Sequence, residues 1–339
     1  MHRPGSIPFT RAASVSNFIT YLNRIGVPTE RYLRQARIPL SLFDDPETPV
    51  PLHLCYRFAE LVTRKEGIDD LGLLVAQNTS LPGLGKYGQV LSQSLTVFDY
   101  LNTGITLLNR FTSGENLRLE AHGNNLRLYH AVPRGAIEAS NQSQLFTLMF
   151  TINILRSVTG NAWSPEELHI AGISSGKLVN VEALANTRIM YDEGPAYFTL
   201  PRSMLELPFK PKMKRQPLIT PENTISSPDQ HADNFLDSLA QLVEILLQDG
   251  YPDIELAAEA AGLNRRTFQR YLADLGLSYS QVVENTRMQL ACRWLETTSM
   301  PVMDIALALG YTDTSNFTRA FRRRAGIPPR RYREQTRGS

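Results

Sequence analysis

The sequence predicts an α+β N-terminal domain joined to an all-α C-terminal domain that contains two helix-turn-helix units. Three observations support this fold class. Helical and strand-like apolar patterns alternate up to residue 207, a proline-rich stretch follows at 208–230, and a helical pattern repeats within 231–339. We therefore expect an α+β domain at 1–207, a linker at 208–230 and a helical domain at 231–339.

The composition is that of a globular protein with more than one domain. Of the 339 residues, 42% are hydrophobic and 20% are charged, which excludes a largely disordered chain. No apolar run reaches the length of a transmembrane helix, and the first residues lack the apolar stretch of a secretory signal, so we expect a cytoplasmic protein without a membrane partner. Two cysteines, Cys55 and Cys292, are too few for a disulfide framework or a cysteine-rich zinc site.

The N-terminal part has segments with helical spacing of apolar residues and short segments that alternate as strands do. The predicted helices are Ser16–Ile25, Leu52–Arg64, Val90–Phe111 and Ser143–Val158. The predicted strands are Leu117–Leu119, Leu126–Val132, Leu168–Ala171, Arg188–Tyr191 and Ala196–Leu200. The first two strands flank Gly123-Asn124-Asn125, a turn sequence that predicts a hairpin. We expect helices on one side of a small, mainly antiparallel sheet.

The linker prediction rests on Pro208–Gln230, which holds five prolines and few apolar pairs. After the linker, Asp233–Leu247 predicts a helix that is terminated by a glycine and a proline. A long helix is expected over Ser280–Leu295, and Ser278 with Gln281 can form a capping box before it.

An internal repeat is the most informative feature of the C-terminal part. The pattern Ala-x-x-x-Gly at 258–262 recurs at 306–310, and Phe-x-Arg at 268–270 recurs at 317–319. The offsets are 48 and 49 residues, so the second copy has one additional residue in its turn. Each copy is a helix, a glycine-containing turn and a helix, which is the helix-turn-helix arrangement.

Turn and cap residues support this arrangement. Gly262 and Gly310 stand where the chain leaves the first helix of each unit, so we expect a positive φ at both. Asn264 can cap the second helix of the first unit, and Thr312 or Asp313 can cap that of the second.

The second helix of a helix-turn-helix enters the major groove of DNA with its N-terminal half facing the base edges. Phe268, Leu272, Phe317 and Phe321 are expected in the core. The outward candidates for DNA contacts are Arg265, Arg266, Gln269 and Arg270 in the first unit and Thr314, Ser315, Thr318 and Arg319 in the second. Arginine and glutamine suit guanine and adenine respectively, and hydroxyl groups are permissive.

The charge distribution also favours a nucleic-acid partner. Residues 251–339 carry 13 arginines, no lysine and nine acids, and residues 319–339 hold eight of these arginines. We therefore add Arg322 and Arg323 to the candidate DNA contacts, since planar guanidinium groups suit phosphates. Arg287 and Arg293 of the long helix are expected to be surface or ion-paired residues.

Several other patterns carry weaker signals. A Gly-x-Gly-x-x-Gly run at 83–88 has no buried strand before it, so we expect a tight loop before a helix near Gln89 and no cofactor. The six histidines show no paired ligand spacing, so we expect no metal site. Five residues are candidates for a ligand pocket, with core packing as the alternative: Tyr87, His130, Phe146, Phe150 and Trp163.

The stretch GYTDTSNFTRAFRRRAGIPPRRYR, residues 310–333, resembles the C-terminal signature of the AraC/XylS family of bacterial transcription regulators. The stretch LAAEAAGLNRRTFQRYL, residues 256–272, resembles the first helix-turn-helix of that family. The resemblance implies a seven-helix DNA-binding domain. It also implies base contacts by Arg266, Gln269 and Arg270 and, in the second unit, by three hydroxyl residues: Thr314, Ser315 and Thr318.

The N-terminal part resembles the arabinose-binding-type sensor domain found in a subset of that family that includes ornithine-utilisation regulators. The residues that carry this resemblance are Ile38-Pro39, Pro49-Val50-Pro51-Leu52, Leu84-Gly85-x-Tyr87-Gly88 and Leu95-Thr96. It implies a ligand-sensing domain, without indicating which small-molecule effector it binds.

Together these features predict a ligand-responsive DNA-binding transcription regulator that reads two successive major grooves and is not an enzyme. The expected partners are promoter DNA, a small effector, a second copy of the chain, and RNA polymerase, which an activator contacts. Two alternatives use the same DNA-binding module: a DNA-modifying enzyme, which would need a reactive cysteine, and a ligand-independent DNA binder.

Overall fold

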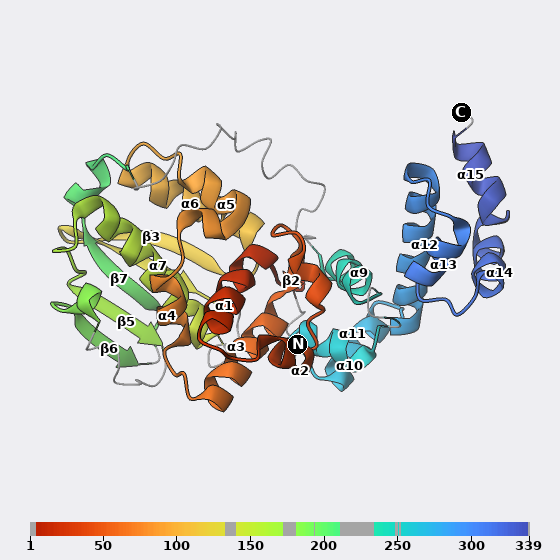
Figure 1. Ribbon diagram of the computed structural model, residues 1–339, viewed down its shortest axis with the longest axis horizontal. Helices are drawn as coiled ribbons and strands as arrows, with labels where there is room; N and C mark the ends of the chain where they lie inside the picture. Colours follow the sequence, from red (N-terminus) through yellow and green to blue (C-terminus); the bar gives the residue numbers. More distant parts are fainter. Residues whose placement is uncertain are drawn as a thin grey trace. The chain divides into compact units, whose positions relative to one another are not determined.

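The computed structural model describes residues 5–132, 140–171, 181–192, 194–210, 234–247, 250 and 252–337. These residues form two compact units (Figure 1). One unit lies within residues 8–210, and the other comprises residues 5–7 and 234–337. Among the described residues, no helix has both the length and the apolar composition that crossing a bilayer requires.

The first unit mixes helices and strands, which confirms the predicted α+β class. Its elements, with η for a 3₁₀ helix, are β1 (Phe9–Arg11), α1 (Ala12–Arg24), α2 (Thr29–Gln35), η1 (Leu40–Phe43), β2 (Pro49–Pro51), α3 (Leu52–Glu66), α4 (Leu71–Gln77), η2 (Leu81–Leu84), α5 (Gly85–Leu91), α6 (Val97–Phe111), β3 (Asn116–His122), β4 (Asn125–Ala131), α7 (Asn141–Thr159), β5 (Glu167–Ala171), η4 (Glu182–Leu184), β6 (Arg188–Asp192), β7 (Ala196–Pro201) and η5 (Arg202–Glu206).

A five-stranded sheet, in the order β3-β4-β7-β5-β6, forms one layer of this unit. All neighbours are antiparallel except β5 and β6, as the mainly antiparallel prediction requires. The rung Leu119–Leu128–Phe198–Leu168 crosses four strands. Since successive side chains of a strand point to opposite faces, this rung defines the apolar face, against which α6 and α7 pack. The opposite face carries polar and aromatic side chains.

The helix predicted over Val90–Phe111 is in fact two helices, α5 and α6. The break has a local cause: the Thr96 side chain accepts from the Asp99 backbone N–H, and the Asp99 carboxylate accepts from the Thr96 N–H, both at 3.1 Å. This capping box starts a new helix at Val97. The helix expected near Gln89 also begins earlier, at Gly85.

The start of the predicted linker is packed on the first unit. Phe209 is buried, and its ring stacks on Tyr100 with 4.6 Å between centroids. The Phe209 N–H donates to the Leu95 carbonyl at 2.8 Å. The remainder of that stretch, residues 211–230, lies outside the described residues.

The second unit is helical, as predicted. Its helices are α9 (Phe235–Leu246), α10 (Ile254–Ala260), α11 (Arg265–Asp274), α12 (Tyr279–Thr297), α13 (Val302–Ala308), α14 (Thr314–Ala325) and α15 (Pro329–Arg337). These seven described helices match the expected number. Figure 1 shows α12 running from the group α9–α11 to the group α13–α15. The predicted capping box is present, since Ser278 accepts from the Gln281 N–H and the Ser278 N–H donates to the Gln281 side chain.

Candidate nucleic-acid interface and cavity

The first helix-turn-helix consists of α10 and α11. Gly262 in the turn has φ 67°, the left-handed conformation that a side chain disfavours. The Asn264 side chain accepts from the Thr267 N–H at 2.9 Å and so caps α11 as predicted. Phe268 and Leu272 are fully buried and hold α11 against the rest of the unit.

The exposed side of α11 brings together the four residues predicted for the first unit. Arg265, Arg266, Gln269 and Arg270 are all exposed. Arg265 differs from its neighbours because its Nη1 lies 2.5 Å from the Glu255 carboxylate of α10. Arg266, Gln269 and Arg270 therefore form an exposed surface on α11, and their contacts with base edges stay a prediction.

The second helix-turn-helix consists of α13 and α14. Gly310 has φ 74°, and the Asp313 side chain accepts from the Asn316 N–H at 2.7 Å. Asp313, rather than Thr312, is therefore the N-cap of α14. Phe317 and Phe321 are buried as expected.

The predicted contact residues of α14 are less exposed than those of α11. Ser315 and Arg319 are exposed, whereas Thr314 and Thr318 are half-buried. The Arg319 guanidinium donates to the Asn316 side chain at 2.6 Å. Long side chains that could reach base edges are thus fewer on α14 than on α11.

Arginines continue from the end of α14 into α15. Arg322 and Arg323 are exposed, as are Arg330 and Arg331. Arg324 is exposed as well, but it donates to the Asn285 side chain of α12. The four exposed arginines without such a contact to α12 are available to phosphates.

The burial of Arg287 was not predicted from the sequence. This residue was expected at the surface or in an ion pair, and the structure shows an ion pair: Nη1 lies 3.1 Å from the Glu284 carboxylate. However, Arg287 is buried and not a surface residue. The single signal in the sequence was the i,i+3 spacing of Glu284 and Arg287. Arg293, by contrast, is an exposed ion-pair partner of Glu244 at 2.5 Å.

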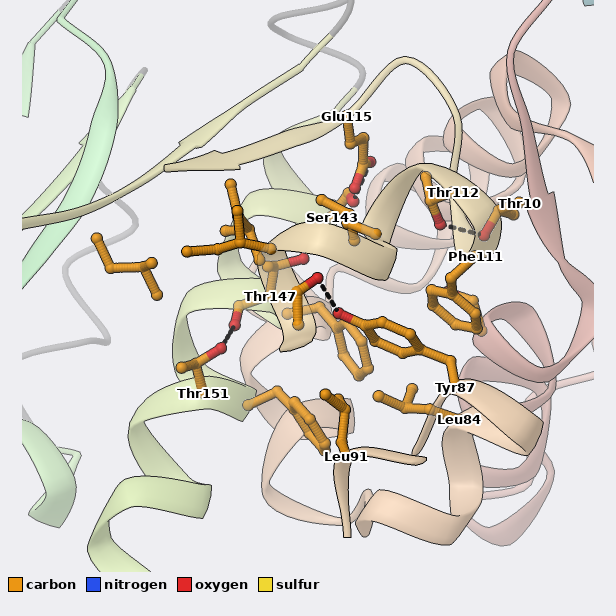
Figure 2. Close-up of a pocket in the computed structure, with 18 of the residues that line it drawn as sticks. Thr10, Leu84, Tyr87, Leu91, Phe111, Thr112, Glu115, Ser143, Thr147 and Thr151 are labelled. Carbon is orange, nitrogen blue, oxygen red and sulfur yellow. Dashed lines mark hydrogen bonds between the residues drawn. The ribbon is translucent and has the colours of Figure 1, made fainter. Parts of the chain in front are cut away.

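A cavity of about 80 Å³ lies inside the α+β unit, among α1, α5, α6, α7 and the sheet (Figure 2). Its volume suffices for several water molecules or a small ligand. The lining residues are Thr10, Ser14, Leu52, Leu84, Tyr87, Leu91, Tyr100, Leu101, Gly104, Ile105, Leu108, Phe111, Thr112, Glu115, Leu117, Leu128, Ser143, Phe146, Thr147, Phe150 and Thr151. In Figure 2, Glu115 and Ser143 lie together at one end, and Leu84 and Leu91 lie at the other.

Three of the five pocket candidates, Tyr87, Phe146 and Phe150, are in this wall. His130 is not a lining residue, but it contacts the wall through Glu115. Trp163 is half-buried outside the lining, near the C-terminal end of α7, where its carbonyl oxygen accepts from Arg156. The sequence did not single out Glu115, because its position after a helix gave no pattern.

Glu115 is a buried carboxylate with three hydrogen-bond partners. Tyr56 and Ser143 donate their hydroxyl groups to Oε1 at 2.6 and 2.7 Å, and His130 Nε2 lies 3.1 Å from Oε2. Burial by itself raises the pKa of Glu115, but the hydrogen bonds from His130, Tyr56 and Ser143 outweigh it, so its pKa is lowered. The carboxylate is thus ionised and already satisfied within the protein.

The other polar groups of the wall are largely engaged as well. The Tyr87 hydroxyl donates to the Gly104 carbonyl at 2.9 Å, and Thr151 donates to the Thr147 carbonyl at 2.8 Å. Burial raises the pKa of the Tyr87 phenol, so it stays protonated. The inner surface therefore offers mainly apolar contacts.

The Gly-x-Gly-x-x-Gly run has a packing role. It covers parts of η2 and α5 and follows α4, not a strand, so it lacks the geometry of a dinucleotide site. A Cβ on Gly88 would lie 1.6 Å from the Leu81 carbonyl oxygen, so this position excludes any side chain. Among the described residues, no three His, Cys, Asp or Glu side chains are grouped as metal ligands would be.

The two units correspond to two known sequence families. Residues 26–209 match the arabinose-binding domain of AraC transcription regulators, and residues 257–335 match a helix-turn-helix domain. The paired helix-turn-helix units and the α+β unit define a two-domain protein of the transcription-regulator class. Because the first match covers more than half of the chain, the protein belongs to the AraC family of transcription regulators.

Individual relatives match over a limited part of their length. The ornithine utilization regulator of Pseudomonas aeruginosa is 45% identical over 84 residues, which is 25% of each protein. The regulator VqsM of the same organism is 38% identical over 98 residues, 28% of this chain and 30% of VqsM. The chain thus matches a quarter to a third of these relatives. The crystal structure of CdpR from Pseudomonas aeruginosa is 20% identical, with 91% of this chain and 96% of that chain covered and a TM-score of 0.36.

Proposed function

We propose that the protein is a ligand-responsive transcription regulator that binds promoter DNA through α11 and α14 and senses a small molecule in the cavity of its α+β unit. The observation that carries this proposal is the pair of helix-turn-helix units, each capped and packed so that its second helix has an exposed side.

In this proposal α11 and α14, the DNA-facing helices of the two helix-turn-helix units, make different contacts with DNA. On α11, Arg266, Gln269 and Arg270 offer long donors that can reach guanine and adenine edges. On α14, the short hydroxyl side chains and the following arginines suit the phosphate backbone. We therefore assign most of the sequence preference to the first unit and mainly backbone contacts to the second.

The helix α12 sets the distance between the two helix-turn-helix units. It has 19 residues, so its length is about 28 Å. One turn of B-DNA is about 34 Å, which a rigid helix of this length with the flanking units can span. This supports recognition of two successive major grooves on one face of the duplex.

The cavity favours a neutral, mainly apolar effector. Among the lining residues Glu115 alone carries a charge, and its oxygens are already hydrogen-bonded to Tyr56, Ser143 and His130. A charged ligand would lose its hydration without gaining a free partner of opposite charge. A small apolar molecule gains burial at no such cost.

The rival enzyme needs a reactive cysteine. Burial raises the pKa of the Cys55 thiol, which donates to the Pro51 carbonyl at 3.3 Å. A protonated thiol is a poor nucleophile, so Cys55 is unsuited to the role that the rival enzyme requires. A second copy of the chain and RNA polymerase complete the proposed partners, and the proposed site of action is the cytoplasm.

The proposal is tested by measuring the thermal midpoint of the full chain with a panel of small neutral molecules and with charged analogues. A neutral binder should raise the midpoint and change the affinity for operator DNA. Thr147→Leu, which fills the cavity, should abolish the shift, while Thr106→Leu on the exposed side of α6 should retain it. Binding by charged analogues alone would contradict the effector class, and a binder that leaves DNA affinity unchanged would contradict ligand control.

A further inference from the structure

The strand β3 is an edge of the five-stranded sheet, since it pairs with β4 alone. A two-residue turn joins the two strands, so His122 and Asn125 form the hydrogen-bonded pair that closes the hairpin. Along β3, hydrogen-bonded pairs alternate with non-hydrogen-bonded pairs. Arg118 and Glu120 therefore direct their backbone N–H and C=O groups to β4. Leu117, Leu119 and Ala121 direct theirs away from the sheet, and none of these groups has a hydrogen-bond partner in the described part of the chain.

Such an edge can pair with a further strand, and proteins usually prevent this with charged side chains. Here Arg118 and Glu120 are exposed, with relative side-chain exposures of 56% and 49%. Arg118 Nε lies 2.9 Å from the Glu120 carboxylate of the same strand, and its guanidinium lies over the Tyr129 ring at 4.6 Å. The two charges are opposite and two residues apart, a pattern that is complementary to itself when reversed.

We propose that β3 pairs antiparallel with β3 of a second copy of this chain, with the two-fold axis at Leu119. The two sheets then form one continuous ten-stranded sheet across the pair, which is an isologous interface. This inference rests on the proposed function, which includes a second copy of the chain, and it names the surface that would join the two copies without DNA or an effector.

The register follows from the charges. Backbone hydrogen bonds between the two β3 strands form only in registers that place Leu117, Leu119 and Ala121 opposite the same set of residues in the partner. With the axis at Leu119, Leu117 faces the partner's Ala121, and Arg118 faces the partner's Glu120 on both sides of the axis. Moving the axis by one residue places Arg118 against the partner's Arg118, or Glu120 against the partner's Glu120. Like charges directly opposite destabilise a strand pair, so the axis at Leu119 is selected over its neighbours.

The apolar side chains are consistent with this register. Leu119 is half-buried and Ala121 is exposed, although both belong to the apolar face of the sheet. Pairing at the axis would place Leu119 beside the partner's Leu119 and extend the rung that runs through Leu128 and Phe198. The pair would therefore cover apolar surface that one chain leaves open.

The opposite edge, β6, is a weaker candidate. It is two residues shorter than β3, so it offers fewer backbone groups to a further strand.

The experiment uses charge reversal in the full chain, with sedimentation velocity as the readout. The wild type should dimerise, and Arg118→Glu or Glu120→Arg should each weaken the dimer roughly tenfold or more, because two cross-strand ion pairs become like-charge contacts. A mixture of the two variants should form a heterodimer, since every Glu then faces an Arg. This mixing step separates a contact between chains from the pair within one chain.

The matched control is the exposed pair Glu60 and Arg64 on α3, where Glu60→Arg or Arg64→Glu should leave dimerisation unchanged. In addition, Leu119→Cys should form a disulfide-linked dimer on mild oxidation, since residues paired across an axis lie within disulfide reach. A monomeric wild type, unchanged dimers in both reversals or a mixture that stays monomeric would overturn the proposal. Each result is independent of operator binding, which is measured separately.

Discussion

The guanidinium of Arg287 donates to the Gly310 carbonyl oxygen at 3.1 Å and so joins α12 to the turn of the second helix-turn-helix. The same guanidinium lies over the Tyr311 ring, 4.8 Å from its centroid. A Cβ on Gly310 would lie 2.9 Å from Arg287 Nη2, so a side chain at this position would displace the guanidinium. One buried arginine thus positions α14 relative to the long helix.

Replacing Arg287 by Ala should lower the free energy of unfolding of the C-terminal unit by about 1–3 kcal/mol, because the Gly310 carbonyl loses its partner and the buried arginine leaves a cavity. Arg293→Ala, which removes an exposed ion pair, should cost less than about 1 kcal/mol. Urea unfolding followed by circular dichroism measures both. Equal losses in the two variants would show that the contact with Gly310 contributes little.

Base recognition should depend on Arg266 and Gln269 and much less on Arg265. Alanine at Arg266 or Gln269 should weaken binding to the cognate operator by about 1–3 kcal/mol and relax the preference at one base pair. Arg265→Ala serves as the control, because Glu255 already engages this guanidinium. Titration of operator variants and random DNA separates the effects, and an equal loss on both DNAs would argue against direct readout.

Salt dependence should identify the arginines that contact phosphate. Arg323→Ala should reduce the magnitude of the slope of log K against log salt concentration by about 1, whatever the DNA sequence. Arg324→Ala should change it less, because this side chain donates to Asn285. An unchanged slope for Arg323→Ala, measured by fluorescence anisotropy at several salt concentrations, would place this residue away from the backbone.

The proposed C-terminal domain, residues 231–339, should fold alone, bind operator more weakly than the full chain and show no response to effector. It should also be less stable than the same unit in the full chain. Ile7, which the fragment lacks, is buried in this unit, and its N–H donates to Ser238 Oγ at 2.8 Å. Circular dichroism and operator titration test these points. A fragment that keeps the full effector response would place the sensor in the wrong domain.

Glu115 should make stability depend on pH. Its pKa is lowered in the folded protein, so its contribution is complete above the unfolded pKa, about 4.3, and is lost as the pH falls through the folded value. Glu115→Gln should destabilise the α+β unit by about 1–3 kcal/mol at neutral pH and flatten the acid limb of its stability curve. Glu60→Gln, at an exposed position of α3, should change neither the stability at neutral pH nor the acid limb. Thermal midpoints measured from pH 3 to 7 test this prediction. Parallel curves for wild type and Glu115→Gln would show that Glu115 does not cause the pH dependence of stability.

The sequence predicted the turns and helix caps that are formed by residues close together in the chain. The hairpin formed at Gly123, the caps formed at Asn264 and Ser278, and both turn glycines have positive φ. These features depend on side chains and backbone within a few residues of each other, so a sequence reading can find them.

Features that depend on distant residues were not predicted. The burial of Arg287 requires the Gly310 turn, 23 residues away, and the Glu115 cluster joins residues from α3, β4 and α7. The break between α5 and α6 was missed for a different reason: the helical spacing on its two sides was extended across the mainly polar residues 92–96, and the Thr96–Asp99 cap signal was not used. Only the packed structure brings the distant groups together.

The stacking of Tyr100 on Phe209 connects the cavity wall to the segment that follows η5. Tyr100 belongs to the cavity wall, and Phe209 follows η5, the last described helix of the α+β unit. Closely packed rings move together, since neither can shift without opening a void. We therefore expect a molecule that displaces Tyr100 in the cavity to displace Phe209 with it.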